Sequence, residues 1–206
     1  LLQEAIAGYD PNDSTSLNAQ VDEYTQVIGE PVKGMKIGII KEAFGEGNDK
    51  AVEKNIYNGI DKLKDEGVTM EEISLKMPIK YGLATYYMIA TSEASTNLAK
   101  YCGMRYGAVE KLEGSFNEYF TKVRSGNFGD EAKRRIILGT FARMAGYRDA
   151  FYLKAMKVRT LIINEYKKAF KKFDALVSPT APILPPKFSE IEKLSPLQHY
   201  MMDIMT

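Results

Sequence analysis

The cationic run Lys133-Arg134-Arg135 is the part of this sequence whose chemistry best fits an anionic ligand. It follows Asp130, where a helix is expected to begin, and cations in the first turns of a helix oppose its macrodipole. The run is therefore expected to have a partner, either a carboxylate of the protein or an anionic ligand. An arginine can hold a carboxylate through two parallel hydrogen bonds, which a lysine cannot do. The residues alone leave an internal salt bridge and a ligand site equally open.

Other chemically interesting residues give weaker signals. His199 is the only histidine, so it is the single possible imidazole base, although packing or exposure explains it more simply. Cys102 is the only cysteine, which excludes a disulfide framework and a cysteine-built metal cluster. The lysines within residues 167–172 are expected in solvent at a helix C-terminus, where the dipole favours cations. Residues 45–47 (Gly-Glu-Gly) lack the third glycine of a dinucleotide-binding fingerprint.

The charge balance limits the partners of the chain. Its 206 residues correspond to about one domain, and its formal net charge of +1 argues against a chain-wide polyanion binder. Residues 1–75 hold 15 acidic and 7 basic residues, whereas residues 76–206 hold 12 acidic and 21 basic residues. This split indicates either two surfaces for different partners or two faces that attract each other within the fold. No apolar run approaches the roughly 18 residues that a membrane span requires.

The elements that must position these residues form an α/β pattern. A β-branched run predicts a buried strand at residues 36–40, and a second strand is expected over residues 68–75. Between them, apolar residues recur at spacings of three and four, which predicts a helix over about residues 49–66. Strand, helix and strand in this order predict a parallel βαβ unit.

The remaining sequence is predicted to be mainly helical. Helices are expected over residues 81–102, 115–124, 130–145, 147–173 and 197–205, and a third strand over residues 174–178. Ser115 and Glu118 have the spacing of a capping box. A sheet of three strands, buried on both faces, is small for so many helices, and both ends of the chain are apolar. We therefore expect a piece of a longer protein; the alternative is a complete chain whose ends dock on its own core.

Several segments of the sequence resemble the amidase signature family. They are residues 7–16, 32–38, 93–98, 105–107, 128–131, 133–136, 157–160 and 178–182. The segments Phe-Gly-Asp-Glu at 128–131 and Lys-Val-Arg-Thr at 157–160 are among the most discriminating. Within the family they are most similar to the A subunits of tRNA-dependent amidotransferases, and the resemblance covers nearly the whole chain in the same order.

This resemblance implies an α/β/α fold with a mixed sheet flanked by helices, incomplete in this chain. Residues 1–206 would form a partial amidase domain, its substrate-recognition side. Members of the family hydrolyse amides with a Ser-Ser-Lys triad in an N-terminal half that carries a Gly/Ser-rich signature, and no such stretch occurs here. No catalytic residue is therefore expected in this chain, which alone should be inactive.

The resemblance also implies a glutamine site formed by Tyr86, Arg135 and Asp203. An arginine suits the α-carboxylate of glutamine, an aspartate suits its α-ammonium group, and Tyr86 offers a hydroxyl. Tyr86 falls off the apolar stripe of its predicted helix, whereas Tyr87 lies on that stripe and is expected in the core.

The implied activity is glutamine hydrolysis that supplies ammonia for converting Glu-tRNA(Gln) to Gln-tRNA(Gln), or Asp-tRNA(Asn) to Asn-tRNA(Asn). The implied partners are the B and C subunits of the same complex. The B subunit would use ATP and Mg and make most of the tRNA contacts, and the C subunit would be small. No cofactor or metal is expected on this chain, and the complex would be cytoplasmic, with no membrane partner. Two alternatives stay open: another amidase signature hydrolase, or a non-catalytic α/β interaction module.

Overall fold

The computed structural model describes residues 1–45, 47–191, 199 and 202. Helical turns η1 to η3 are 3₁₀ and η4 is a π-helix. The described elements are, in chain order, α1 (Leu2–Ile6), η1 (Tyr24–Val27), β1 (Lys36–Ile40), η2 (Lys41–Ala43), α2 (Lys50–Asp65), β2 (Thr69–Ile73), α3 (Lys76–Asn97), η3 (Leu98–Lys100), α4 (Phe116–Asn127), α5 (Asp130–Arg143), η4 (Asp149–Leu153), α6 (Lys154–Ala169), β3 (Ala175–Val177) and α7 (Phe188–Ile191). The predicted α/β class is confirmed.

The sheet has the order β2-β1-β3, and both of its described pairings are parallel. In the central strand β1, position 38 has room only for glycine. A Cβ there would approach Leu176 Cδ2 at 2.8 Å and Ile73 Cγ2 at 3.0 Å. Burial on both faces, which the sequence predicted, holds for β1 but not for β2. Since β2 is an edge strand in the described sheet, its Glu71 and Glu72 remain exposed.

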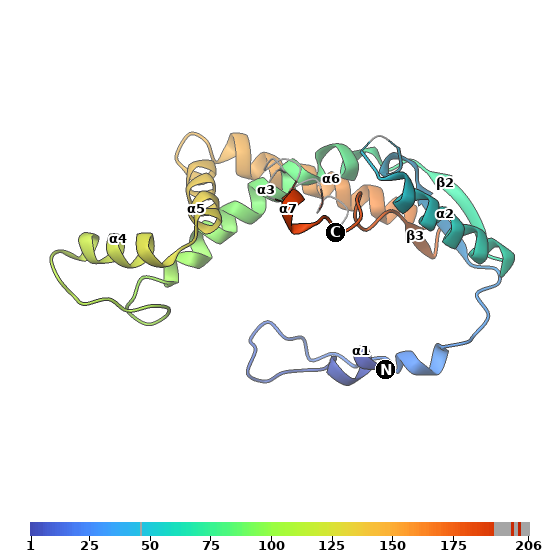
Figure 1. Cartoon of the computed structure of the whole chain (residues 1–206), viewed down its shortest axis with the longest axis horizontal. Coiled ribbons are helices and arrows are strands. Elements are labelled where there is room, and N and C mark those ends of the chain that lie inside the picture. The colour runs from blue at the N-terminus through green and yellow to red at the C-terminus, as the bar shows by residue number, and fades with distance from the viewer. Residues whose placement is uncertain (46, 192–198, 200–201, 203–206) are drawn as a thin grey trace.

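Three helices build the part of the molecule beyond the sheet. Helix α3 packs against both α5 and α6. Figure 1 shows α3 and α6 running along the long axis, with α5 across their end away from the sheet and α4 beyond it. The hydrophobic core joins this part to the sheet, because Ile40, Leu75 and Ala169 are buried together where β1 ends, α3 begins and α6 ends.

The N-terminal segment lies apart from these layers. Figure 1 shows α1 and η1 connected to β1 by an extended segment without regular secondary structure. Large apolar side chains on α1 are left in solvent, with Leu2 74% and Ile6 70% exposed. The apolar character that the sequence shows here is therefore not satisfied by contacts among the described residues.

Two predicted helices have different bounds in the structure. Helix α3 begins at Lys76, five residues before the prediction, because two distant carboxylates satisfy backbone N–H groups at its start. Glu42 accepts from Leu75 N at 2.9 Å, and Glu165 accepts from Met77 N at 2.9 Å. The helix predicted over residues 147–173 spans residues 149–169 in the structure: a hydrogen bond from Leu153 N to the carbonyl five residues back makes its first turn, η4, a π-helix that continues directly into α6. The helix predicted over residues 197–205 falls largely outside the described residues.

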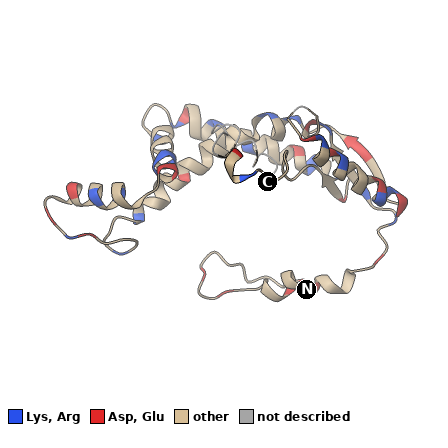
Figure 2. Cartoon of the chain, viewed as in Figure 1, with Lys and Arg blue, Asp and Glu red and all other residues tan. Residues whose placement is uncertain are grey.

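Charges of both signs occur together on several helices. Figure 2 shows Lys or Arg and Asp or Glu together along α2, α4 and α5. Each ion pair of the described residues joins partners within one half of the sequence, either 1–75 or 76–206. Direct ion pairing of two oppositely charged halves, one of the two predicted explanations of the charge split, is therefore not observed in the described part of the chain. Within that part, no helix has both the length and the apolar character to cross a membrane.

Candidate functional site

The close contact between α3 and α5 positions the candidate site. Gly139 of α5 lies so near α3 that an added Cβ would stand 1.9 Å from the Thr91 carbonyl oxygen. The α3 side of this contact is polar, since Thr91 is 1% exposed and Ser92 is 0% exposed. Their hydroxyls donate to backbone carbonyls of their own helix, Tyr87 O at 2.5 Å and Met88 O at 2.6 Å, so burial leaves neither unsatisfied.

Arg135 lies on α5 one turn before this contact and faces α3. Its Nε donates to Glu131 Oε1 at 3.0 Å, four residues earlier on the same helix. The Tyr86 hydroxyl of α3 lies near enough to contribute to the pKa of Arg135, whose Cζ lies 5.9 Å from the centroid of the Tyr87 ring. The hydrogen bond to Glu131 and the nearby Tyr86 hydroxyl raise the pKa of Arg135 despite the opposing effect of partial burial, so the group stays cationic.

Tyr86 and Tyr87 form an aromatic edge beside this guanidinium. Their rings meet edge to face, with centroids 5.3 Å apart and an interplanar angle of 85°. Tyr86 is 51% exposed, in agreement with its predicted position off the apolar stripe. The expectation that Tyr87 belongs to the core is wrong, since it is only half-buried. The α3 surface against α5 is formed by Thr91 and Ser92 instead, because only small side chains allow the approach at Gly139.

The fold thus brings together two of the three residues that the resemblance implied. Tyr86 and Arg135 are 49 positions apart in the sequence and lie near enough in the structure for the Tyr86 hydroxyl to affect the pKa of Arg135. The third, Asp203, lies outside the described residues. Sequence reasoning missed two neighbours of Arg135: Glu131, which accepts from its Nε, and the ring of Tyr87. The spacing of Glu131 four residues before Arg135 is a known helix-stabilising pattern and could have identified the first of them.

The cationic run has carboxylate partners on its own helix. Lys133 lies 4.0 Å from Asp130, and Glu131 pairs with both Arg134 and Arg135. Internal salt bridges, one of the two alternatives from the sequence, are therefore present. These salt bridges leave hydrogen-bond donors of Arg135 for a ligand, because a guanidinium has five donors and 35% of the Arg135 side chain is exposed. The cluster of Glu131, Arg134 and Arg135 has a net charge of +1 and can bind a carboxylate.

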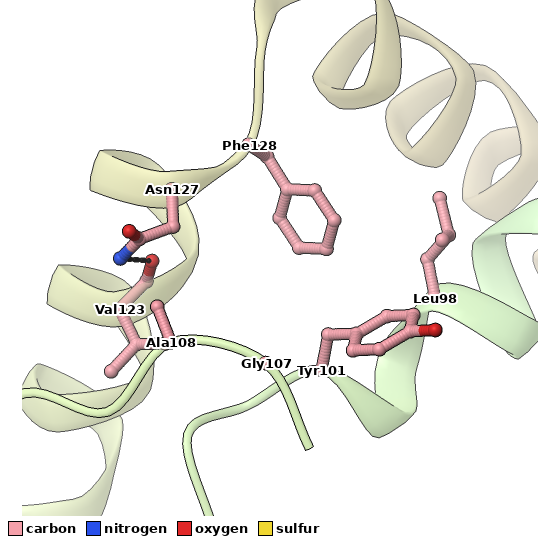
Figure 3. A pocket seen from close by; sticks show the side chains of 7 residues that line it. All are labelled: Leu98, Tyr101, Gly107, Ala108, Val123, Asn127 and Phe128. Atoms are coloured by element: carbon pink, nitrogen blue, oxygen red, sulfur yellow. Dashed lines mark hydrogen bonds between the residues drawn. The ribbon is translucent and has the colours of Figure 1, made fainter.

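A separate cavity of about 230 Å³ lies just beyond the C-terminal end of α3 (Figure 3). It is lined by Leu98, Tyr101, Gly107, Ala108, Val123, Asn127 and Phe128. The Asn127 amide is used locally, donating to Val123 O at 2.9 Å. Since no lining residue is charged, this cavity suits a small apolar group and does not suit glutamine, which carries both a carboxylate and an ammonium group.

The remaining candidates from the sequence are not assembled into a site. Cys102 and His199 are half-buried, and the lysines at 167, 168, 171 and 172 are exposed at the end of α6. The described residues contain no cluster of three or more His, Cys, Asp or Glu that could hold a metal ion. Residues 45 and 47 lie in a loop, with residue 46 outside the described part.

Comparisons with known proteins point to one family. The amidase family profile matches residues 1–206. The chain is 50% identical over 206 residues to the A subunit of the glutamyl-tRNA(Gln) amidotransferase of Microcystis aeruginosa, and 50% identical over 208 residues to that of Thermodesulfovibrio yellowstonii. Each match covers 100% of this chain and 42% of the relative, so the chain spans less than half the length of these curated relatives.

Solved structures show the same likeness. The crystal structure of the glutamyl-tRNA(Gln) amidotransferase A subunit from Thermotoga maritima aligns with a TM-score of 0.69 and 35% identity, covering 100% of this chain and 39% of that one. A bacterial aryl acylamidase of the amidase signature family aligns with a TM-score of 0.62 over 89% of this chain and 34% of its own. At 18% identity the second likeness concerns the fold alone. With a profile match over its full length and this fold, the chain belongs to the amidase family.

Proposed function

We propose that this chain is the glutamine-recognition part of the glutaminase A subunit in a tRNA-dependent amidotransferase. One observation carries the proposal: α5 packs on α3 so that Arg135, with 35% of its side chain exposed, lies beside the Tyr86–Tyr87 pair. The identity of about half of all positions to named A subunits supports the choice among amidases. The parent protein would release ammonia from glutamine for the amidation of Glu-tRNA(Gln) or Asp-tRNA(Asn).

Each proposed ligand contact follows from the charge of glutamine. The α-carboxylate binds the terminal nitrogens of Arg135 through charge-assisted hydrogen bonds. The nearby Tyr86 hydroxyl can donate its own proton to the same carboxylate. Asp203 is proposed to receive the α-ammonium group, which would leave the side-chain amide directed away from Arg135 toward the attacking nucleophile.

The nucleophile is proposed to lie outside residues 1–206, which would form a partial amidase domain without the N-terminal catalytic half. Exposed apolar groups support this division. Phe141 is 44%, Tyr147 43% and Phe151 38% exposed, although their three rings pack against one another. An aromatic cluster of this kind on a surface is typical of a face that further protein covers. We propose that the rest of the same domain covers it.

The proposed partners are the B and C subunits of a cytoplasmic complex. The B subunit would use ATP and Mg and make most of the tRNA contacts, and the chain itself would bind no cofactor. The net charge of +1 supports a minor role in tRNA binding, since a chain that binds a polyanion along its length is usually strongly basic.

The test measures ammonia release from glutamine by the full-length protein with its partner subunits. Arg135→Ala should raise the KM for glutamine by about 100-fold, because an arginine–carboxylate contact contributes about 2–3 kcal/mol. The matched control is Lys133→Ala, which removes a cation of the same run that pairs only weakly with Asp130 and should leave the KM unchanged. An unchanged KM in Arg135→Ala would remove Arg135 from the site.

The same assay separates the two alternatives. Release of ammonia from other amides but not from glutamine would identify another amidase signature hydrolase. A full-length protein that hydrolyses no amide would favour the interaction module.

A further inference from the structure

Glu131 occupies an unusual place for a carboxylate, beside a guanidinium proposed to bind the carboxylate of a ligand. It lies in the first turn of α5, where a negative charge is favoured by the helix dipole. Its Oε1 accepts from Arg135 Nε at 3.0 Å, and its Oε2 accepts from Arg134. The two oxygens are therefore both engaged by arginines, which neutralises the repulsion that a free carboxylate would exert on an anionic ligand.

The pairing decides which edge of Arg135 remains for a ligand. A guanidinium can hold a carboxylate side-on, through Nε and one terminal nitrogen, or end-on, through both terminal nitrogens. Because Glu131 already accepts the hydrogen bond from Nε–H, a ligand carboxylate cannot bind side-on. The four N–H groups on the two terminal nitrogens point away from Nε. The end of the guanidinium is the part left for a carboxylate.

The Tyr87 ring limits the remaining freedom of the guanidinium. Its centroid lies 5.9 Å from Arg135 Cζ, within the range of a cation–π contact. Tyr86 in turn rests edge to face on Tyr87. The guanidinium is thus fixed at Nε by Glu131 and bounded by two rings of α3.

We infer that Glu131 is a positioning residue, which orients Arg135 so that its terminal nitrogens receive the α-carboxylate of the substrate end-on. This inference rests on the proposed function. Glu131 does not touch the substrate; it acts through Arg135, and Arg134 keeps the three-residue cluster at a net charge of +1.

The experiment measures glutamine hydrolysis by the full-length protein in its amidotransferase complex, with kcat and KM determined separately. Glu131→Ala frees Nε and should raise the KM about tenfold, with kcat within twofold of the wild type. Glu131→Gln keeps an oxygen that can accept from Nε and should raise the KM only about threefold. Asp130→Asn is the matched control, because it removes the same charge from the same helical turn without touching Arg135, and its KM should equal that of the wild type.

The possible outcomes separate this inference from the proposed function. A KM that is unchanged or lowered in Glu131→Ala, while Arg135→Ala raises it, overturns the positioning role and leaves the glutamine site intact. Equal KM increases in Glu131→Ala and Asp130→Asn, with equal losses of melting temperature, also overturn it, since they indicate a general helix-stabilising role. If Arg135→Ala itself has no effect on KM, the proposed site fails and the positioning role fails with it.

Discussion

At the scale of single residues, the candidate site depends on one arginine that the protein orients while leaving some of its N–H donors for a ligand. Arg135 has a carboxylate at Nε, a hydroxyl and an aromatic ring around it, and part of its guanidinium remains in solvent. The sequence predicted Tyr86 and Arg135 as partners of one ligand through resemblance. The spacing of apolar residues along each helix does not predict that Tyr86 and Arg135 come together, because their proximity depends on how the two helices cross.

The Tyr86 hydroxyl is expected to contribute to binding and not to stability. Tyr86→Phe removes the hydroxyl proposed to donate to the α-carboxylate and should raise the KM for glutamine about fivefold, which corresponds to about 1 kcal/mol. Since the side chain is 51% exposed, the melting temperature should not change. Tyr81→Phe, the same substitution on an exposed tyrosine of the same helix, is the control. A wild-type KM in Tyr86→Phe would contradict the proposed role.

At the scale of elements, the contact of α3 with α5 is what brings the site residues together. Apolar periodicity predicted a conventional stripe on α3, but the most buried positions facing α5 are Thr91 and Ser92. The contact is set by the absence of a side chain at Gly139, so backbones approach where an amphipathic pattern would place larger residues. A hydrophobicity pattern cannot reveal such a contact, because it depends on the small size of the residues on both helices.

Gly139→Ala is expected to separate α3 from α5. The added methyl group would meet the Thr91 carbonyl at 1.9 Å, and a backbone atom cannot rotate away as a side chain can. We expect a loss of about 3 kcal/mol in the free energy of unfolding, together with a raised KM for glutamine. Gly59→Ala in α2, where a Cβ meets nothing within 4 Å, should instead stabilise the protein by about 0.5–1 kcal/mol. Denaturant unfolding of the full-length variants distinguishes these signs, and a neutral Gly139→Ala would refute the packing argument.

Glu42 is expected to make the start of α3 sensitive to acid. Desolvation alone would raise the pKa of its carboxyl, but hydrogen bonds from the Ser74 hydroxyl and the Leu75 amide outweigh it, so the pKa is lowered. A carboxyl with a lowered folded-state pKa stabilises the protein above the unfolded-state value, about 4.3, and loses this contribution as the pH falls through the folded value.

The test compares Glu42→Gln with the wild type by denaturant unfolding at several pH values. At pH 7 the variant should be less stable by about 1 kcal/mol, since a partly exposed carboxylate is screened by solvent. The difference should shrink as the pH falls below about 4. Glu72→Gln, on the exposed edge strand, should show no comparable difference. A constant difference across this pH range would show that charge on Glu42 is unimportant.

At the scale of the whole molecule, a small parallel sheet supports a longer helical part with exposed apolar clusters. The N-terminal segment and the aromatic cluster of Phe141, Tyr147 and Phe151 both leave large apolar groups in solvent. This arrangement fits a chain that spans 42% of its curated relatives. The charge split of the sequence persists in the N-terminal segment, where residues 1–32 carry only acidic charges, whereas both signs share α2, α4 and α5.

The purified 206-residue chain is expected to release no ammonia from glutamine. The proposed glutamine contacts bind the substrate but include no nucleophile. The measurement compares this chain with the full-length protein at equal concentration, and co-expression of the chain with the remainder of the full-length protein should restore activity. Glutamine hydrolysis by the isolated chain at a substantial fraction of the full-length rate would contradict the proposed division of the domain.

The sequence by itself determined the α/β class, the parallel βαβ unit and the capping box at Ser115. These features depend on residues close together in the chain, whose spacing and hydrogen-bonding groups dictate local structure. Only the tertiary structure decided where α3 begins, since its first N–H groups are satisfied by the distant Glu42 and Glu165. It also decided that Arg135 lies near Tyr86, because their proximity depends on the approach of two helices at Gly139, where a missing side chain has no periodic signature.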